Sequence, residues 1–409
     1  MQLSIPTSQR SRTLEFGIYR DGDNNLDMSQ SLAIAQALES SRTDSAVEYT
    51  VEDTTGLRVD DGDVVDGRKR TDEFTIADGE VGDSRTGKAR NMASESNLAA
   101  FVARTLDDAQ KSGAKQAWID LVDHGGGDGG GLETHTGAVM SMPDMAKAVA
   151  DGIAMHAKEH PEDAGRTIDG VVANQCLMST LGFADALSRA GVKYLAASPE
   201  TMLSPGVPTG VADAIAKNVE DPSAMATGIV DTVMRTRFQT PYGESFGTAA
   251  AFNVLDCSPG KIANAEAAIK TFNDAVANDA ADRTDIRRDV ASVDGMVRFE
   301  DATPDMPWHA DRPAIALYSA IASDARLPAQ LRADARSAAQ ATRALVMAHK
   351  ESRSFGPFDG SSYADAAGPT VHAPLSAKQI DPWASNGISE TNNAFYDSVD
   401  QAKFVRAVA

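Results

Sequence analysis

Short apolar runs of strand length alternate with longer amphipathic stretches along most of the chain. Residues 116–122 and 168–173 are such runs, and each ends in a turn of polar residues or glycines. A short apolar run that is closed by a turn and followed by a helix is typical of a buried parallel strand. The pattern therefore predicts an α/β protein, with further strands at 14–20, 46–51, 194–198 and 247–255.

Apolar residues also recur at helical spacing between these runs. In residues 94–111, Leu98, Phe101, Val102 and Leu106 would share one face of a helix. The same spacing or a high alanine content predicts further helices, at 28–40, 142–160, 177–189, 210–218, 223–238, 261–280, 327–350 and 395–408. Val64-Val65 and 74–76 suggest a small hairpin between the early strands.

Two chemically reactive side chains directly follow the two best-defined strands. His124 lies after 116–122, and Cys176 lies after 168–173. Parallel neighbours present their carboxyl ends at one edge of a sheet, so the two side chains are expected to share a cleft. A thiol becomes a good nucleophile when a base takes its proton or its pKa falls, and a helix starting at Leu177 would favour the thiolate. Glycines after His124 let backbone N–H groups approach a reacting carbonyl.

The residues around this pair give the chain a specific resemblance. It resembles the clostripain family of cysteine peptidases, which are relatives of caspases, gingipains and legumains. The similarity is carried by Asp21–Leu26, Asp123–Gly127, Cys176–Met178 and the segment from Tyr194 to Gly206. A His-to-Cys spacing of about 50 residues, with Gln before the Cys, is also similar to the caspase pattern.

The resemblance implies a caspase-like, mostly parallel sheet sandwiched by helices, with a catalytic core at 14–256. It also implies that His124 and Cys176 are the catalytic pair and that Gly125 contributes to the oxyanion site. Residues 257–409 are expected to be mainly helical. They would return a strand at about 369–374 to the core or form a small subdomain.

The chain departs from the family where substrate specificity is set. Relatives that cleave after Arg or Lys usually carry an acid two residues before the nucleophile and a second acid in the next loop. Asn174 and Val207 occupy these positions here, and Glu200 or Asp213 are the nearby acids that remain. We expect substrate contacts from Asn174, Ser198, Glu200 and Val207, in a pocket that does not select Arg or Lys.

Composition and charge limit the classes of molecule that the protein is expected to bind. The 409-residue chain carries a net charge of −21, which disfavours nucleic acid and anionic membranes. No apolar run is long enough to span a bilayer, and residues 1–13 lack the apolar core of a secretory signal. Two cysteines do not form a disulfide scaffold. We expect a cytoplasmic protein that acts on protein or peptide substrates, although a leaderless exported effector would look the same; its oligomeric state is left open.

No cofactor is required by this chemistry, and no metal ligands are predicted. Alternating acidic and amide residues between Asp21 and Asp27 resemble the start of a calcium loop, but Leu26 replaces the usual glycine. Turn and capping roles are favoured there, and Ca²⁺ stays open. His156 and His160 are spaced i, i+4 without the His-Glu-x-x-His order, which disfavours zinc.

Three functional hypotheses remain. The favoured one is a cysteine endopeptidase that works through a Cys-His dyad and a thioester acyl-enzyme. The main alternative is a catalytically silent caspase-like module used for binding or as an adaptor, for which loss of the specificity acid is the best support. The third is a metal-dependent hydrolase built from the Asp-rich turns.

Overall fold

The computed structural model describes most of the chain. The described residues are 12–43, 46–60, 63–134, 136–239, 245–278, 283–295, 310–352, 363, 365–376, 379 and 393–409. None of the helices in these ranges combines the length and the apolar character needed to cross a bilayer.

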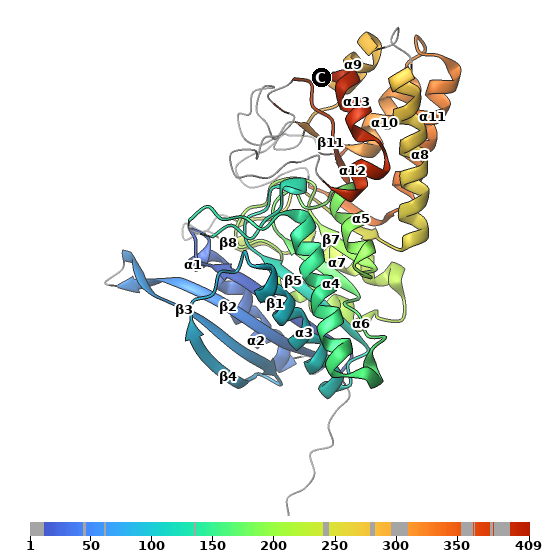
Figure 1. The fold of residues 1–409 in the computed structure, drawn as a ribbon. Coiled ribbons are helices and arrows are strands. Elements are labelled where there is room, and N and C mark those ends of the chain that lie inside the picture. Colours follow the sequence, from blue (N-terminus) through green and yellow to red (C-terminus); the bar gives the residue numbers. More distant parts are fainter. Residues whose placement is uncertain are drawn as a thin grey trace, which may run out of the picture.

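A nine-stranded sheet forms the centre of the molecule (Figure 1). Its strands, from one edge to the other, are β12 (Val346–Glu351), β10 (Ala251–Asp256), β7 (Tyr194–Ala197), β6 (Gly170–Asn174), β5 (Gln116–Val122), β1 (Leu14–Gly22), β2 (Val47–Asp60), β3 (Asp63–Ala77) and β4 (Glu80–Lys88). The run from β7 through β6, β5 and β1 to β2 is parallel, and the outer strands are antiparallel. This confirms the predicted mostly parallel sheet.

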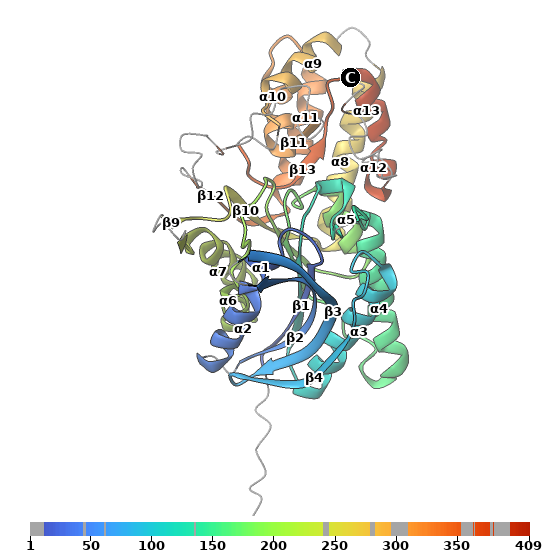
Figure 2. The same ribbon diagram turned by 90° about the vertical axis from the view of Figure 1, so that its left-hand side faces the viewer.

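Helices cover both faces of the sheet (Figure 2). One face carries α3 (Glu95–Ser112), α4 (Met142–Glu159) and α5 (Leu181–Arg189), and the other carries α2 (Leu32–Thr43), α6 (Gly210–Lys217) and α7 (Pro222–Arg235). The alternation of β5 explains the two layers. Ile119 and Leu121 belong to the first core, whereas Trp118 and Val122 belong to the second.

The C-terminal region is mainly helical, as predicted (Figure 1). Its helices are α8 (Pro259–Asn278), α9 (Arg283–Ser292), α10 (Ala314–Ser323), α11 (Ala329–Arg343), α12 (Ala394–Ser398) and α13 (Gln401–Val408). Two short strands, β11 (Asp311–Pro313) and β13 (Thr370–His372), pair with each other. A boundary at residue 257 stays a prediction, because β12 from this region joins the central sheet.

Two elements differ from the sequence-based expectation. The helix expected at 327–350 ends at Arg343, and its last residues form β12 instead, because they pair antiparallel with β10. Val64-Val65 and 74–76, expected as the two arms of a small hairpin, both lie in the single long strand β3, which pairs with β2 and with β4. The strand expected near 369–374 is present as β13, which pairs with β11 and forms a bridge from Thr370 to Thr180; the choice between a strand returned to the core and a small subdomain stays a prediction.

Candidate active site

His124 and Cys176 occupy equivalent positions at the carboxyl ends of neighbouring strands. β5 and β6 are parallel, and Val122 lies opposite Asn174 in their register. Each reactive residue comes two positions after that pair. Both line one cavity of about 280 Å³, so the structure brings the two predicted residues to the same site.

The imidazole of His124 is oriented by the turn after β1. Its Nε2 lies 2.8 Å from Oδ1 of Asn25. An amide oxygen only accepts, so Nε2 carries the proton and Nδ1 keeps its lone pair. Burial lowers the pKa of His124, and nearby Glu133 opposes this shift. A neutral imidazole with a free Nδ1 is suited to act as a general base.

The thiol of Cys176 is held by the loop after β7. Its Sγ accepts a hydrogen bond from the Met202 N–H at 3.2 Å. The helix expected to begin at Leu177 begins at Leu181, where Thr180 caps it by accepting from Phe183 N. The expected contribution of a helix N-terminus to a thiolate is therefore wrong, and an N–H from the facing loop contacts the sulfur instead.

Gly125 packs directly against the backbone of Cys176. A Cβ at Gly125 would lie 2.4 Å from the Cys176 carbonyl oxygen, 3.0 Å from its nitrogen and 2.7 Å from Cβ of Gln175. Only glycine fits there, and its absence of a side chain lets two backbones meet beside the thiol. That proximity is what the predicted oxyanion role of Gly125 needs.

The glycine-rich loop that follows His124 has a defined shape. Gly126 N–H donates to Gly130 O at 2.7 Å, and Gly131 forms backbone bridges to Gly125 and Met140. Asp128 in this loop is buried and accepts from Thr180 Oγ1. A second cavity of about 100 Å³ lies along the loop and is also lined by His124.

Asn174 forms hydrogen bonds to the loop after β7, which lines part of the cavity. Its Nδ2 donates to Val207 O at 3.2 Å, and its Oδ1 accepts from Val207 N at 2.7 Å. The contact is close, because a Cβ on Gly206 would lie only 2.0 Å from that Oδ1. Asn174 lines the cavity, whereas the Val207 side chain is buried in the core on the α6 and α7 face.

Ser198 and Glu200 shape the same loop from inside the protein. Ser198 Oγ donates to Glu200 O at 2.7 Å and to Ala251 O at 2.9 Å. The Glu200 carboxylate accepts a hydrogen bond from Thr201 N at 2.9 Å. Ser198 and Glu200 are both fully buried. Neither is among the residues that line the cavity, so direct substrate contact by Ser198, Glu200 or Val207 stays a prediction.

Sequence reasoning missed most of the cavity wall. Besides the predicted residues, it is lined by Leu26, Gln30, Asp123, Gln175, Thr201, Met202, Leu203, Ser204 and Gly206. Most of these lie in the turn after β1 or in the loop after β7. The one sequence feature that could have indicated these lining residues is that the second loop directly follows Glu200, which is predicted to contact substrate.

Two buried carboxyls, Asp120 and Asp123, lie in β5 and directly after it. Burial raises the pKa of Asp120 to about 8, and burial together with Asp21 raises the pKa of Asp123 well above its usual range. Asn24 Nδ2 donates to Asp123 Oδ1 at 2.5 Å. Among the described residues that line the cavity, Asp123 is the only acid, and its raised pKa disfavours the charged form.

The acidic turn after β1 disperses its side chains among different partners. Asp23 pairs with Lys69 at 2.6 Å, Asp27 pairs with Arg20 at 3.0 Å, and Asn25 contacts His124. These contacts fit the turn and positioning roles. Calcium binding at this turn stays a prediction.

No family model matches the sequence, and no curated protein matches it. The fold is similar to that of iotapain, a secreted C11 cysteine protease from Bacteroides thetaiotaomicron, with a TM-score of 0.63 and 15% identity over 95% of this chain and 99% of the other. A secreted C11 cysteine protease from Bacteroides thetaiotaomicron in complex with an irreversible peptide inhibitor gives a TM-score of 0.62 at 15% identity, again over 95% of this chain and 99% of the other.

A third structure, an inactive zymogen of a C11 protease from Parabacteroides distasonis, matches with a TM-score of 0.60 at 14% identity over 95% of this chain and 98% of that one. C11 is the clostripain family, so the predicted resemblance is confirmed at the level of the fold. The expected cytoplasmic location is contradicted, because two of these neighbours are described as secreted.

Proposed function

We propose that the protein is a cysteine peptidase that cleaves protein or peptide substrates through Cys176 and His124. The observation that carries this proposal is that both side chains line one cavity at the carboxyl edge of adjacent parallel strands. The similarity of the fold to C11 cysteine proteases, one of them bound to a peptide inhibitor, supports it.

In the proposed reaction the two groups act together on the peptide bond. Sγ of Cys176 forms a bond to the substrate carbonyl carbon while Nδ1 of His124 takes the thiol proton. The carbon–nitrogen bond then breaks as His124 returns that proton to the leaving amine. Water attacks the resulting thioester with His124 as base, which releases the acid and restores the thiol.

Stabilisation of the oxyanion comes from the backbone. In this proposal the N–H groups of Gly125 and Cys176 donate to the carbonyl oxygen as it gains charge, a role worth about 3 kcal/mol for each donor. The requirement for glycine at 125 supports this placement, because a side chain would separate the two backbones.

The cavity favours a side chain without positive charge on the residue before the cleaved bond. Its wall carries amide and hydroxyl groups from Gln30, Asn174, Thr201 and Ser204 and apolar groups from Leu26, Met202 and Leu203. A lysine or arginine needs a paired carboxylate when it is buried. Asn174 is an amide, and burial raises the pKa of Asp123, which disfavours the carboxylate that a buried Lys or Arg would need.

The second cavity extends the site. It is lined by His124, the glycine-rich loop, Glu133 and Val139. Because His124 lines this cavity and Cys176 does not, we assign it to the residues after the cleaved bond, whose amine His124 protonates.

A digest of a peptide library by the wild type, Cys176→Ala and His124→Ala tests the proposal. Cleavage by the wild type alone, after uncharged residues, is the expected result. Cleavage after Arg or Lys that is lost in Asp123→Asn would contradict the assigned specificity and leave the peptidase intact. No cleavage by any variant, together with slow alkylation of Cys176, would favour the silent binding module.

A further inference from the structure

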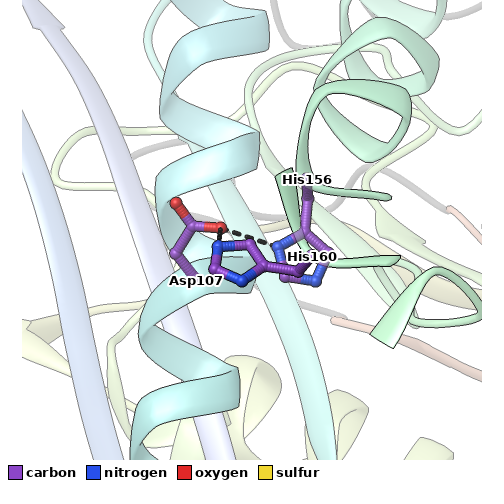
Figure 3. A group of neighbouring side chains, drawn as sticks. All are labelled: Asp107, His156 and His160. Carbon is purple, nitrogen blue, oxygen red and sulfur yellow. Dashed lines mark hydrogen bonds and ion pairs between the residues drawn. The ribbon is translucent and has the colours of Figure 1, made fainter. Parts of the chain in front are cut away.

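A cluster of titratable side chains lies far from the catalytic cavity, between α3 and α4. Figure 3 shows Asp107 of α3 facing His156 and His160 at the end of α4. Nδ1 of His156 lies 2.7 Å from Oδ1 of Asp107, and Nε2 of His160 lies 3.2 Å from the same oxygen. The three potential ligand atoms lie within 4.8 Å of one another.

The other nitrogen of each imidazole faces a different carboxylate. Nε2 of His156 lies 3.4 Å from Oδ2 of Asp163, and Nδ1 of His160 lies 3.5 Å from Oε1 of Glu162. The short 3-10 helix η2 (Pro161–Asp163) brings both acids back over the histidines.

Two neutral imidazoles carry too few N–H groups to donate a hydrogen bond at every nitrogen that faces a carboxylate. All four ring nitrogens face carboxylates, but two neutral rings carry only two N–H groups. His156 Nε2 is buried and hydrogen-bonds nothing in the described part of the chain. A positive charge between the rings and Asp107 removes this mismatch.

We propose that Asp107, His156 and His160 bind a divalent transition-metal ion, with Zn²⁺ as the best match. Two imidazole nitrogens and one carboxylate oxygen are ligands that zinc accepts at about 2.0–2.2 Å, which places neighbouring ligands about 3.4 Å apart. The observed 2.7 and 3.2 Å separations from the Asp107 oxygen would have to lengthen by about 0.7 and 0.2 Å to reach that geometry.

The surrounding acids fit the same ion. When the inner nitrogens bind the metal, the outer nitrogens keep their protons and donate to Asp163 and Glu162. Ligating histidines commonly donate in this way to carboxylates, which fixes the tautomer and the ring orientation. Asp163 is itself held by Arg166 at 2.6 Å. Asp107 and His160 are partly exposed, which leaves solvent access for the ion and for a water as the fourth ligand.

The position of the site indicates a structural role. α3 leads into the start of β5 and α4 leads into the start of β6, so the cluster lies toward the amino edge of the sheet, whereas Cys176 lies at the carboxyl edge. An ion bound there joins α3, which precedes the His124 strand, to α4, which lies between His124 and Cys176 in the sequence. The proposal is therefore independent of the peptidase assignment.

Zinc binding to the full-length, tag-free protein tests the proposal. The Cys176→Ala background is used throughout, because a thiol beside an imidazole is itself a zinc ligand pair. After metal is removed with EDTA and the chelator is washed out, Zn²⁺ is titrated against a chromophoric zinc indicator. We expect one ion per chain and a rise in Tm of roughly 5 °C at saturating zinc.

The variants identify the ligands. Asp107→Asn and His160→Gln are each expected to weaken zinc binding by at least ~100-fold and to abolish the rise in Tm. Glu159→Gln, which changes a neighbouring exposed acid on α4, is the matched control and is expected to bind zinc as the background does. His160 is partly exposed, so its variant is expected to fold even if the Asp107 variant does not.

Two results would overturn the metal site. One is the absence of stoichiometric binding, or equal binding in the background and in His160→Gln. The other is a Tm that changes with pH through the histidine range while zinc has no effect, because protonated histidines would then supply the positive charge. If either result is obtained and the wild type still shows full peptidase activity, the metal site is refuted and the proposed function stands.

Discussion

Asn174→Asp is the substitution that would restore the acid expected at this position in Arg- and Lys-specific relatives. In this chain we expect it to destabilise the protein instead of creating basic specificity. Asn174 Nδ2 donates to Val207 O and its Oδ1 accepts from Val207 N. A carboxylate keeps the second bond and loses the first, and it points an oxygen at the Val207 carbonyl.

The magnitude follows from the neighbouring acid. Asp120 and Asn174 are both about 2% exposed, and burial raises the pKa of Asp120 to about 8. A comparable shift at position 174 is about four units above the unfolded value, and about 1.4 kcal/mol per unit sets a ceiling of about 5 kcal/mol at pH 8. At pH 5, only about one unit separates the pH from the unfolded pKa, so the same reasoning gives about 1.5 kcal/mol.

The sign of the pH dependence is fixed by the direction of the shift. A carboxyl whose pKa is raised in the folded state binds its proton more tightly there, so stability falls as the pH rises from about 4 to about 8. Urea unfolding of wild type and Asn174→Asp between pH 5 and pH 8 measures this difference. Asn174→Ala is the control, since it also loses the Val207 contacts but adds no titratable group. Because Asn174 hydrogen-bonds Asp120 and lowers the pKa of that carboxyl, the control carries the pH dependence that comes from Asp120, and the difference between the two variants gives the part due to the new carboxyl.

The same variants report on specificity. If Asn174→Asp is as stable as wild type at pH 8 and gains cleavage after Arg or Lys, then Asn174 is a substrate-contacting residue and our account of the loop is refuted. We expect reduced kcat/KM for uncharged peptides, because the loop that carries Met202 and Ser204 is released from its buried anchor.

Four further results are expected. Asn25→Ala should lower kcat by roughly 10- to 100-fold with little change in KM, because the imidazole loses the acceptor that fixes its tautomer; an unchanged kcat would show that Asn25 positions nothing. Iodoacetamide should alkylate Cys176 and spare Cys257, whose burial raises its pKa, as peptide mass mapping would show. Asp120→Asn should raise the free energy of unfolding by about 2–5 kcal/mol at pH 8 and by almost nothing below pH 4, as urea titrations at the two pH values would show. EDTA should leave kcat/KM unchanged, and a loss of activity that Ca²⁺ alone restores would contradict the expectation that no cofactor is needed.

The positions of the reactive residues were predictable because they depend on local patterns. The apolar runs end at Val122 and Ala173, and the parallel strands they predict present their carboxyl ends together. The residues that make each strand apolar and the residues that form the turn after it lie next to one another in the sequence. For this reason the fold class, most helices and the placement of His124 and Cys176 agree with expectation.

The elements that differ depend on partners distant in sequence. Residues 346–351 follow an alanine-rich helix and continue its apolar pattern, yet they form β12 because β10 offers an unpaired edge. Leu177 fits the apolar repeat of α5, but its positive φ ends that continuity and Thr180 supplies the cap. Asp107 lies about 50 residues before His156, so no local pattern could place it beside the histidines.

The cavity wall shows why substrate specificity was the hardest feature to predict. Relatives that select Arg or Lys do so with a carboxylate in the pocket, so the identity of one residue carries the prediction. Here Asn174, Ser198 and Glu200 are buried and bind backbone atoms of the loop after β7. Specificity then depends on the conformation that these bonds impose on residues 201–206, which supply much of the wall. A change at a buried anchor alters several lining groups together, so residue-by-residue transfer from a relative fails even where the catalytic pair is kept.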